Sequence, residues 1–415
     1  MRLGLVGSVL LGAALGSSRG LFAQHAPLAP LPQLPAYTTP ASSLYVAADQ
    51  SGVRFRPVEL RFARRQTYQF TRPRSVKALY VNAWAFSGAR LWDLIRLADS
   101  TEINAFVIDV KDDTGCLLYR SVVASAEEIG ANHCAHLASV RTRLDSVVAH
   151  GIYPIARIVV AKDPLLAERK VQWSVQQVGG GLWRDRIGIA WVDAFNDSVW
   201  VYAADLGREA VKLGFSEVQF DYVRFPDEPR ERMATAIFAA RRAGESQRAA
   251  VRRHVQLLAD RIKPLGAPVT FDIFGLTASA DGDLGIGQVW EDFAGVADVV
   301  LPMVYPSHYY HGAFGFDTPN AHPYRIVQLA LKDALARSRD LPSPALIRPF
   351  LQAFTLGRRL PRYTPFEIRE QIRAAEELGI DSWVLWNPRS VYQRDSLRPY
   401  RTTARASAAA GGGSQ

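Results

Sequence analysis

The feature that most constrains the fold is a regular alternation of short apolar segments with longer amphipathic ones. The short segments recur between residues 78 and 386, are rich in β-branched and aromatic residues, and are apolar at nearly every position. Such segments are typical of strands buried on both faces, as in a parallel sheet. The expected strands are eight: 78–82, 105–110, 153–159, 217–223, 269–274, 298–305, 347–354 and 382–386.

Helical periodicity fills the stretches between these strands. Helices are expected at 89–99, 137–150, 199–213, 248–263, 323–336 and 365–377. Eight strands alternating with helices predict an α/β protein of the (β/α)8 TIM-barrel type with an N-terminal extension. An open doubly wound sheet is the alternative, but it normally has a glycine-rich phosphate turn after its first strand. Residues 82–88 (NAWAFSG) do not form one.

The two ends of the chain differ in composition from the expected barrel. Residues 1–23 have a basic start, an apolar stretch too short to span a bilayer comfortably, and an acceptable cleavage site at Ala23. They predict a cleaved signal peptide, and an uncleaved N-terminal anchor is the alternative. Residues 24–75 predict a Pro-rich linker and short extension, 76–400 the barrel domain, and 401–415 a disordered tail rich in Ala, Gly and Ser. We therefore expect a periplasmic or secreted protein with no stable membrane span after cleavage.

The chain has two cysteines, Cys116 and Cys134. In an exported protein an even, small number permits one disulfide, and two free thiols are the alternative. Two cysteines without clustered histidines do not make a zinc site. We expect neither a metal nor a cofactor.

The formal net charge of +9 raises the question of an anionic partner. Loss of Arg2 and Arg19 with the signal peptide lowers it to +7, and the remaining excess is spread along the chain. No zinc-finger or RNP-type motif accompanies it, so no nucleic-acid partner is expected. Binding to an anionic surface or to nucleic acid is the third and weakest hypothesis. A 48% apolar composition excludes a disordered chain.

Carboxylates stand near the ends of several expected strands. The active site of such a barrel lies at the C-terminal ends of its strands, and a carboxylate in an apolar strand is costly unless it is paired or functional. Asp109, Asp221 and Asp272 occupy such positions on the second, fourth and fifth strands. Glycoside hydrolysis needs two carboxyl groups, one protonated and one ionised, and mutual repulsion separates their pKa values.

Aromatic and basic residues follow the same strands and are candidates for substrate binding. Aromatic rings can stack on sugars, and a cation can keep a nearby Asp ionised or bind an anionic sugar. Structural roles are the alternative: Asp109 with Lys111, or Asp221 with Arg224, could be ion pairs at strand ends. The candidate binding residues are Asp109, Lys111, Trp84, Tyr222, Arg224, Tyr305, His308, Trp386 and Asn387.

At these residues the sequence resembles a known bacterial family. The stretches 76–82 (VKALYVN), 220–226 (FDYVRFP), 303–309 (MVYPSHY) and 382–392 (SWVLWNPRSVY) carry the resemblance, in family order. The family is the bacterial glycoside hydrolase domain family, a (β/α)8-barrel group of unknown function. It is distantly similar to amylase- and α-galactosidase-type glycosidases.

The resemblance implies roles for two of the carboxylates. Those glycosidases carry their nucleophile at the end of the fourth strand, which matches Asp221, and usually their acid/base at the end of the fifth, where Asp272 stands. Amylase-type enzymes have Glu at that second position and a further Asp on the seventh strand, where this chain has Arg348 and Gln352.

We therefore expect an exported retaining glycosidase acting on a polysaccharide or cell-wall glycan, with the two carboxyl groups about 5–6 Å apart. A non-catalytic glycan-binding TIM barrel is the alternative. The oligomeric state is not predicted.

Overall fold

The computed structural model describes residues 72–357 and 360–400. The predicted signal peptide, most of the predicted linker and extension, and the predicted tail lie outside the described residues. Among the described residues, no helix has both the length and the apolar character that crossing a membrane requires.

Eight parallel strands close into a barrel, which confirms the predicted (β/α)8 fold. Each strand pairs with the next along the chain, β11 returns to β1, and β10 contacts both β11 and β8. The barrel strands are β1 (Lys77–Val81), β2 (Ala105–Lys111), β3 (Tyr153–Val159), β5 (Glu217–Asp221), β7 (Val269–Phe274), β8 (Val299–Met303), β9 with β10 (Leu346–Ile347, Phe350–Gln352) and β11 (Trp383–Trp386).

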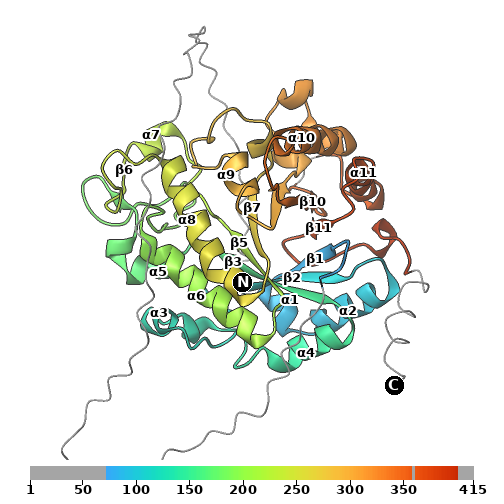
Figure 1. Ribbon diagram of the computed structural model, residues 1–415, viewed down its shortest axis with the longest axis horizontal. Helices are drawn as coiled ribbons and strands as arrows, with labels where there is room; N and C mark the ends of the chain where they lie inside the picture. Colours follow the sequence, from blue (N-terminus) through green and yellow to red (C-terminus); the bar gives the residue numbers. More distant parts are fainter. Residues whose placement is uncertain (1–71, 358–359, 401–415) are drawn as a thin grey trace, which may run out of the picture. The chain divides into compact units, whose positions relative to one another are not determined.

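Helices surround the strands, as Figure 1 shows for α2, α4, α6 and α8. The long helices pack their buried face on the barrel and expose the other, because their apolar residues recur with helical spacing. They are α2 (Arg90–Ser100), α4 (Arg141–Ala149), α6 (Asp197–Leu213), α8 (Gln247–Ile262), α10 (Pro323–Ser338) and α11 (Pro365–Glu376). Shorter helices are α1 (Ala83–Ser87), α3 (Ala124–Glu128), α5 (Pro164–Arg169), α7 (Arg230–Met233) and α9 (Trp290–Ala294).

The seventh strand differs from the continuous segment predicted at 347–354. It is split into β9, which pairs with β8, and β10, which pairs with β11. Pro349 lies between the two pieces and has no N–H to give to a ladder. The neighbouring Arg348 is fully buried and binds Glu217 at 2.6 Å, so this position serves packing inside the barrel.

Two apolar layers hold the barrel together. Inside the strands lies a compact cluster that includes Tyr153, Ile155, Val299 and Leu301. A larger cluster fills the space between the strands and the helices. This division follows from the alternation of side chains along each strand, since successive residues point to opposite faces.

Connecting segments at the C-terminal ends of the strands carry further structure. A two-stranded antiparallel sheet joins β4 (Gln176–Gln177) to β6 (Ala236–Ile237). In the segment between β2 and α4, Cys116 and Cys134 form a disulfide with their Cα atoms 5.5 Å apart. Of the two alternatives that the sequence left open for these cysteines, the structure has the bridge.

Candidate active site

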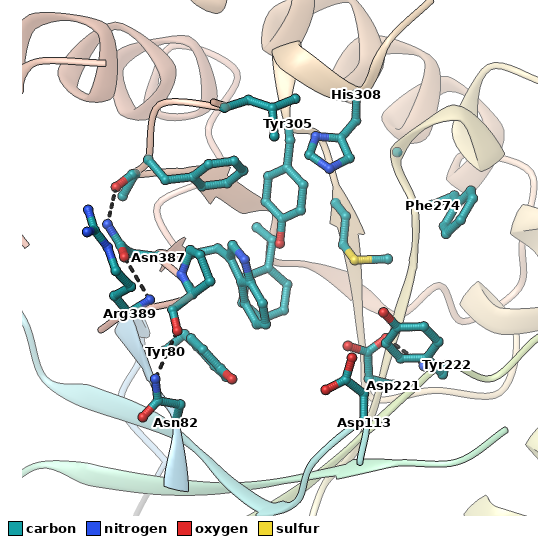
Figure 2. A pocket seen from close by; sticks show the side chains of 18 of the residues that line it. Tyr80, Asn82, Asp113, Asp221, Tyr222, Phe274, Tyr305, His308, Asn387 and Arg389 are labelled. Atoms are coloured by element: carbon teal, nitrogen blue, oxygen red, sulfur yellow. Dashed lines mark hydrogen bonds between the residues drawn. The ribbon is translucent and has the colours of Figure 1, made fainter. Parts of the chain in front are cut away.

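A cavity of about 1480 Å³ opens where the barrel strands end. Its wall draws residues from the C-terminal ends of β1, β2, β5, β7, β8, β10 and β11 and from the loops that follow them. Figure 2 shows Tyr80 and Tyr305 on one side of this space, and Asp113 and Asp221 with the rings of Tyr222 and Phe274 on the other. This is the position at which (β/α)8 enzymes carry their active sites.

Arg157, on β3, organises the floor of the cavity. Its guanidinium binds Asp109 Oδ1 at 2.5 Å, Asp221 Oδ2 at 2.5 Å and lies 3.7 Å from Asp272 Oδ2. The three carboxylates come from β2, β5 and β7, so residues far apart in the sequence meet around one cation. A buried cluster of like charges is tolerable only with such a partner.

Asp221 is the carboxylate that is best placed for chemistry. It ends β5, lines the cavity, and accepts hydrogen bonds from Arg157 Nε at 3.1 Å and from the backbone N–H of Tyr222 at 2.5 Å. Tyr222 has φ 53°, in the left-handed region that non-glycine residues rarely occupy. This turn places the Tyr222 N–H on the Asp221 carboxylate, and such strain clusters at functional sites.

Asp272 lies beneath the cavity floor and does not line the cavity. Its side chain is 0% exposed, and its Oδ2 accepts a hydrogen bond from Gln219 at 2.9 Å. Burial first, then repulsion from Asp221 and a hydrogen bond shared with it, raise the pKa of Asp272 well above its usual value. Burial and the neighbouring Asp221 therefore favour the protonated form of Asp272.

Asp109 shares the floor with Tyr80. The Tyr80 hydroxyl donates a hydrogen bond to Asp109, whose other oxygen binds Arg157. Burial raises the pKa of Asp109 to about 6, against the lowering effect of Arg157. The structure thus contains a lining carboxyl group that titrates near neutrality.

Aromatic rings form the opposite wall. Trp386 stacks on Tyr80 with ring centroids 3.8 Å apart, and Tyr305 lies 6.5 Å from Trp386 and 5.3 Å from His308. Trp84 stands at the mouth with 75% of its surface exposed. Stacked and exposed rings of this kind provide flat apolar surfaces for ligands.

Asp113 is a further carboxylate that lines the cavity. Asp113 follows β2, and Figure 2 draws it on the same side of the cavity as Asp221 and Tyr222. Lys162 Nζ binds it at 2.7 Å and keeps its pKa below the usual value, although burial acts in the other direction. Asp113 and Lys162 belong to the site together.

The structure places the residues predicted from sequence as follows. The cavity is lined by Trp84, Asp109, Asp221, Tyr222, Arg224, Tyr305, His308, Trp386 and Asn387. Asn387 connects two strand ends, because its Nδ2 donates to the Ala353 carbonyl at 2.7 Å and its Oδ1 accepts from the Arg389 N–H at 3.0 Å.

Lys111 does not line the cavity, so it is not placed to bind a substrate there. It is 1% exposed and its ammonium binds Asp163 at 2.5 Å, against the Tyr202 ring of α6. The pairing register of β2 shifts between Asp109 and Lys111. This irregularity breaks the alternation, so Asp109 faces the cavity and Lys111 faces the helices. The sequence left open an ion pair between Asp109 and Lys111. In the structure Asp109 binds Arg157 and Lys111 binds Asp163 instead.

Three site residues were not singled out from the sequence: Arg157, Asp113 and Lys162. Arg157 had a signal, since it is the one charged residue inside the apolar strand YPIARIV. Asp113 and Lys162 lie beyond strand ends, where only the fold brings them together. Among the described residues no group of three or more His, Cys, Asp or Glu side chains is arranged to hold a metal ion.

Comparison with known families settles the relationship. Residues 78–392, which include every barrel strand residue except Lys77 at the start of β1, match the family model described as "Putative glycosyl hydrolase domain". The chain belongs to this family. The resemblance predicted from the sequence is confirmed, and membership places the barrel among the glycosidases, whose substrates are carbohydrates.

Two solved structures illustrate the similarity. A hypothetical protein from Ruminiclostridium thermocellum ATCC 27405 is 34% identical, over 47% of this chain and 96% of that chain, with a TM-score of 0.41. The glycoside hydrolase domain of PgaB (BpsB) from Bordetella bronchiseptica is 15% identical, over 78% of this chain and 99% of that chain, with a TM-score of 0.53. At 15% identity, the similarity to the PgaB domain concerns the fold alone. Comparison with curated proteins gave no match.

Proposed function

We propose that the protein is an exported, retaining glycosidase that cleaves a polysaccharide or cell-wall glycan, with Asp221 as its nucleophile. One observation carries the proposal: Asp221 ends a barrel strand on the floor of an aromatic-lined cavity and is held by Arg157 and a backbone N–H. Export is supported by the signal-like segment at 1–23 and by the disulfide, since disulfides persist in oxidising compartments.

The contacts of Asp221 suit a nucleophile. Arg157 and the Tyr222 N–H stabilise the ionised carboxylate and fix its direction. The carboxylate can then attack an anomeric carbon held against the Trp386 and Tyr80 rings, and the covalent intermediate is resolved by water.

Proton transfer to the leaving oxygen requires a group that reaches the cavity, and Asp272 has no exposed surface there. We therefore move this role from Asp272 to Asp109, which lines the cavity and whose pKa burial raises to about 6. Protonated Asp109 gives its proton to the leaving oxygen, and the carboxylate that remains is held by Arg157. Water attacking the intermediate returns a proton along the same route.

The size of the cavity suits a polymer. About 1480 Å³ exceeds the roughly 300–1,000 Å³ of sites for small ligands, so several sugar rings fit. The exposed Trp84 at the mouth extends the apolar surface beyond the reacting centre.

The test is a screen of cell-wall glycans and exopolysaccharides with purified protein, read by release of reducing ends and by NMR of the first anomer formed. We expect one class to be cleaved with retention, and Asp221→Asn to lower the rate by about 10²–10⁴-fold while the fold is kept. The control is Asp93→Asn on the exposed surface of α2, which should leave the rate unchanged. Wild-type rates in Asp221→Asn would reject the assignment. Glycan binding without product from the wild type would replace it with a non-catalytic binding barrel.

A further inference from the structure

Arg224 is a buried cation that has no acidic partner within residues 72–357 and 360–400, the part of the chain that the structure describes. Among the described residues four Lys or Arg side chains are buried: Lys111, Arg157, Arg224 and Arg348. Three of them bind carboxylates, namely Lys111 with Asp163, Arg157 with Asp109 and Asp221, and Arg348 with Glu217. Arg224 is 6% exposed, and no carboxylate oxygen of the described residues lies within 4.0 Å of it.

The surroundings of Arg224 form a cage that is open toward the cavity. Its guanidinium carbon lies 4.6 Å from the Phe274 ring centroid, 4.9 Å from that of Tyr222 and 5.1 Å from that of Trp191. All four side chains line the cavity. Ring faces attract a cation but accept no conventional hydrogen bond, so they offset only part of the cost of burying it.

The donors of Arg224 show which ligand would complete the cage. Nη1 donates to the Phe225 carbonyl at 2.8 Å, and Nε and Nη2 donate to none of the described residues. Nε and Nη2 form one planar edge of the guanidinium, the edge that binds a carboxylate through two parallel hydrogen bonds. Burial lowers the pKa of Arg224, as expected for a cation that lacks a close counter-ion.

The nearby carboxylates are already engaged or lie too far away. Asp185 accepts hydrogen bonds from the Ile187 and Ile189 N–H groups and from Trp191 Nε1 at 2.9–3.1 Å, so its oxygens serve the loop around it. Asp221 is bound to Arg157. Asp221, Asp185 and Asp227 act on Arg224 only from beyond ion-pairing distance.

We propose that Arg224 binds a carboxylate on the sugar next to the reacting centre, so that the substrate is an acidic glycan. This inference rests on the proposed function, because the site it describes adjoins Asp221. A uronic acid and a sugar with a carboxyalkyl ether both supply the required group.

The test compares acidic oligosaccharides with their carboxyl-reduced forms by isothermal titration calorimetry. One pair is an oligouronate, and the other is an oligosaccharide with lactyl ether groups. Asp221→Asn protein prevents turnover. At least one acidic form should bind about 10- to 100-fold more tightly than its reduced form. Which pair shows the preference identifies the source of the carboxylate.

Variants connect the preference to Arg224. In the same background, Arg224→Gln should lower the affinity for the acidic form to that of the reduced form, whose own affinity stays unchanged. Arg389→Gln, at another arginine that lines the cavity, is the matched control and should keep the preference. Thermal unfolding gives a second readout, since removal of an unpaired buried charge should not lower the midpoint. Arg224→Lys keeps the positive charge but lacks the planar edge that donates two parallel hydrogen bonds. It should therefore retain part of the preference for the acidic form.

Several outcomes would overturn the proposal: equal affinity for acidic and reduced forms in both pairs, an equal loss of both in Arg224→Gln, or a large fall in the thermal midpoint. The proposed function fails separately. An acid preference without hydrolysis would keep the carboxylate site and remove the glycosidase, whereas hydrolysis of neutral glycans without a preference would do the reverse.

Discussion

Ionisation of Asp109 on the floor of the cavity should lower the free energy of unfolding at neutral pH, and this effect can be measured. Asp109 is held between Tyr80 and Arg157, with its pKa raised by burial from 3.8 to about 6. The perturbation is Asp109→Asn. Asparagine has the shape of the protonated acid and cannot ionise, so it removes the titration with little change in packing.

The magnitude follows from the pKa shift. An acid whose pKa is higher in the folded than in the unfolded protein opposes folding once it ionises. The penalty is absent below pH 3.8, grows as the pH rises toward 6, and is constant above that. At 1.36 kcal/mol for each pKa unit, it reaches about 3 kcal/mol at pH 7.5.

The assay is urea unfolding followed by tryptophan fluorescence between pH 4 and 7.5. The free energy of unfolding of Asp109→Asn, minus that of the wild type, should rise by up to about 3 kcal/mol across this range, mostly between pH 4 and 6. Asp93→Asn serves as the exposed control. A difference for Asp109→Asn that does not change with pH, or that falls as the pH rises, would refute the reasoning.

Three further predictions concern the loop, the wall and the floor. Replacing Cys116 and Cys134 by Ser opens a bridge between residues 18 apart and should lower the free energy of unfolding by about 3 kcal/mol, and an unchanged urea midpoint would contradict this. Trp386→Ala removes the ring stacked on Tyr80 and should raise KM by roughly 2- to 10-fold with a smaller change in kcat; an unaltered KM would exclude a substrate platform there. Asp272→Asn should lower kcat by about 10- to 100-fold and shift the pH profile while binding persists, whereas a loss as deep as in Asp221→Asn would give Asp272 a direct part in the reaction.

Most of the fold could be predicted because its strands carry a strong local signal. The expected segments 153–159 and 269–274 coincide with β3 and β7, and the order of the strands follows from the barrel topology. The seventh strand was harder, since Pro349 interrupts its ladder while the apolar pattern continues across it. The apolar periodicity shows which residues are apolar, but it does not show that a proline lacks the N–H group that the strand ladder needs.

The candidate site was predictable at strand ends and less so beyond them. Asp109 and Asp221 were found because a carboxylate that ends an apolar strand needs a reason to be there. Lys111 could not be placed, because one irregularity in β2 turns it away from the cavity. The depth of Asp272 and the meeting of Asp113 with Lys162 depend on side-chain packing and on loops, which a linear pattern does not encode.

The central claim is that Asp221 forms the covalent bond to the sugar. Azide rescue of Asp221→Gly tests it most directly, once the substrate screen has supplied a cleaved glycan. The small anion should occupy the space left by the carboxylate, restore cleavage, and give a glycosyl azide with the anomeric configuration opposite to that of the substrate. Cleavage by Asp221→Gly at the wild-type rate without azide, or rescue that produces the azide of unchanged configuration, would contradict the claim.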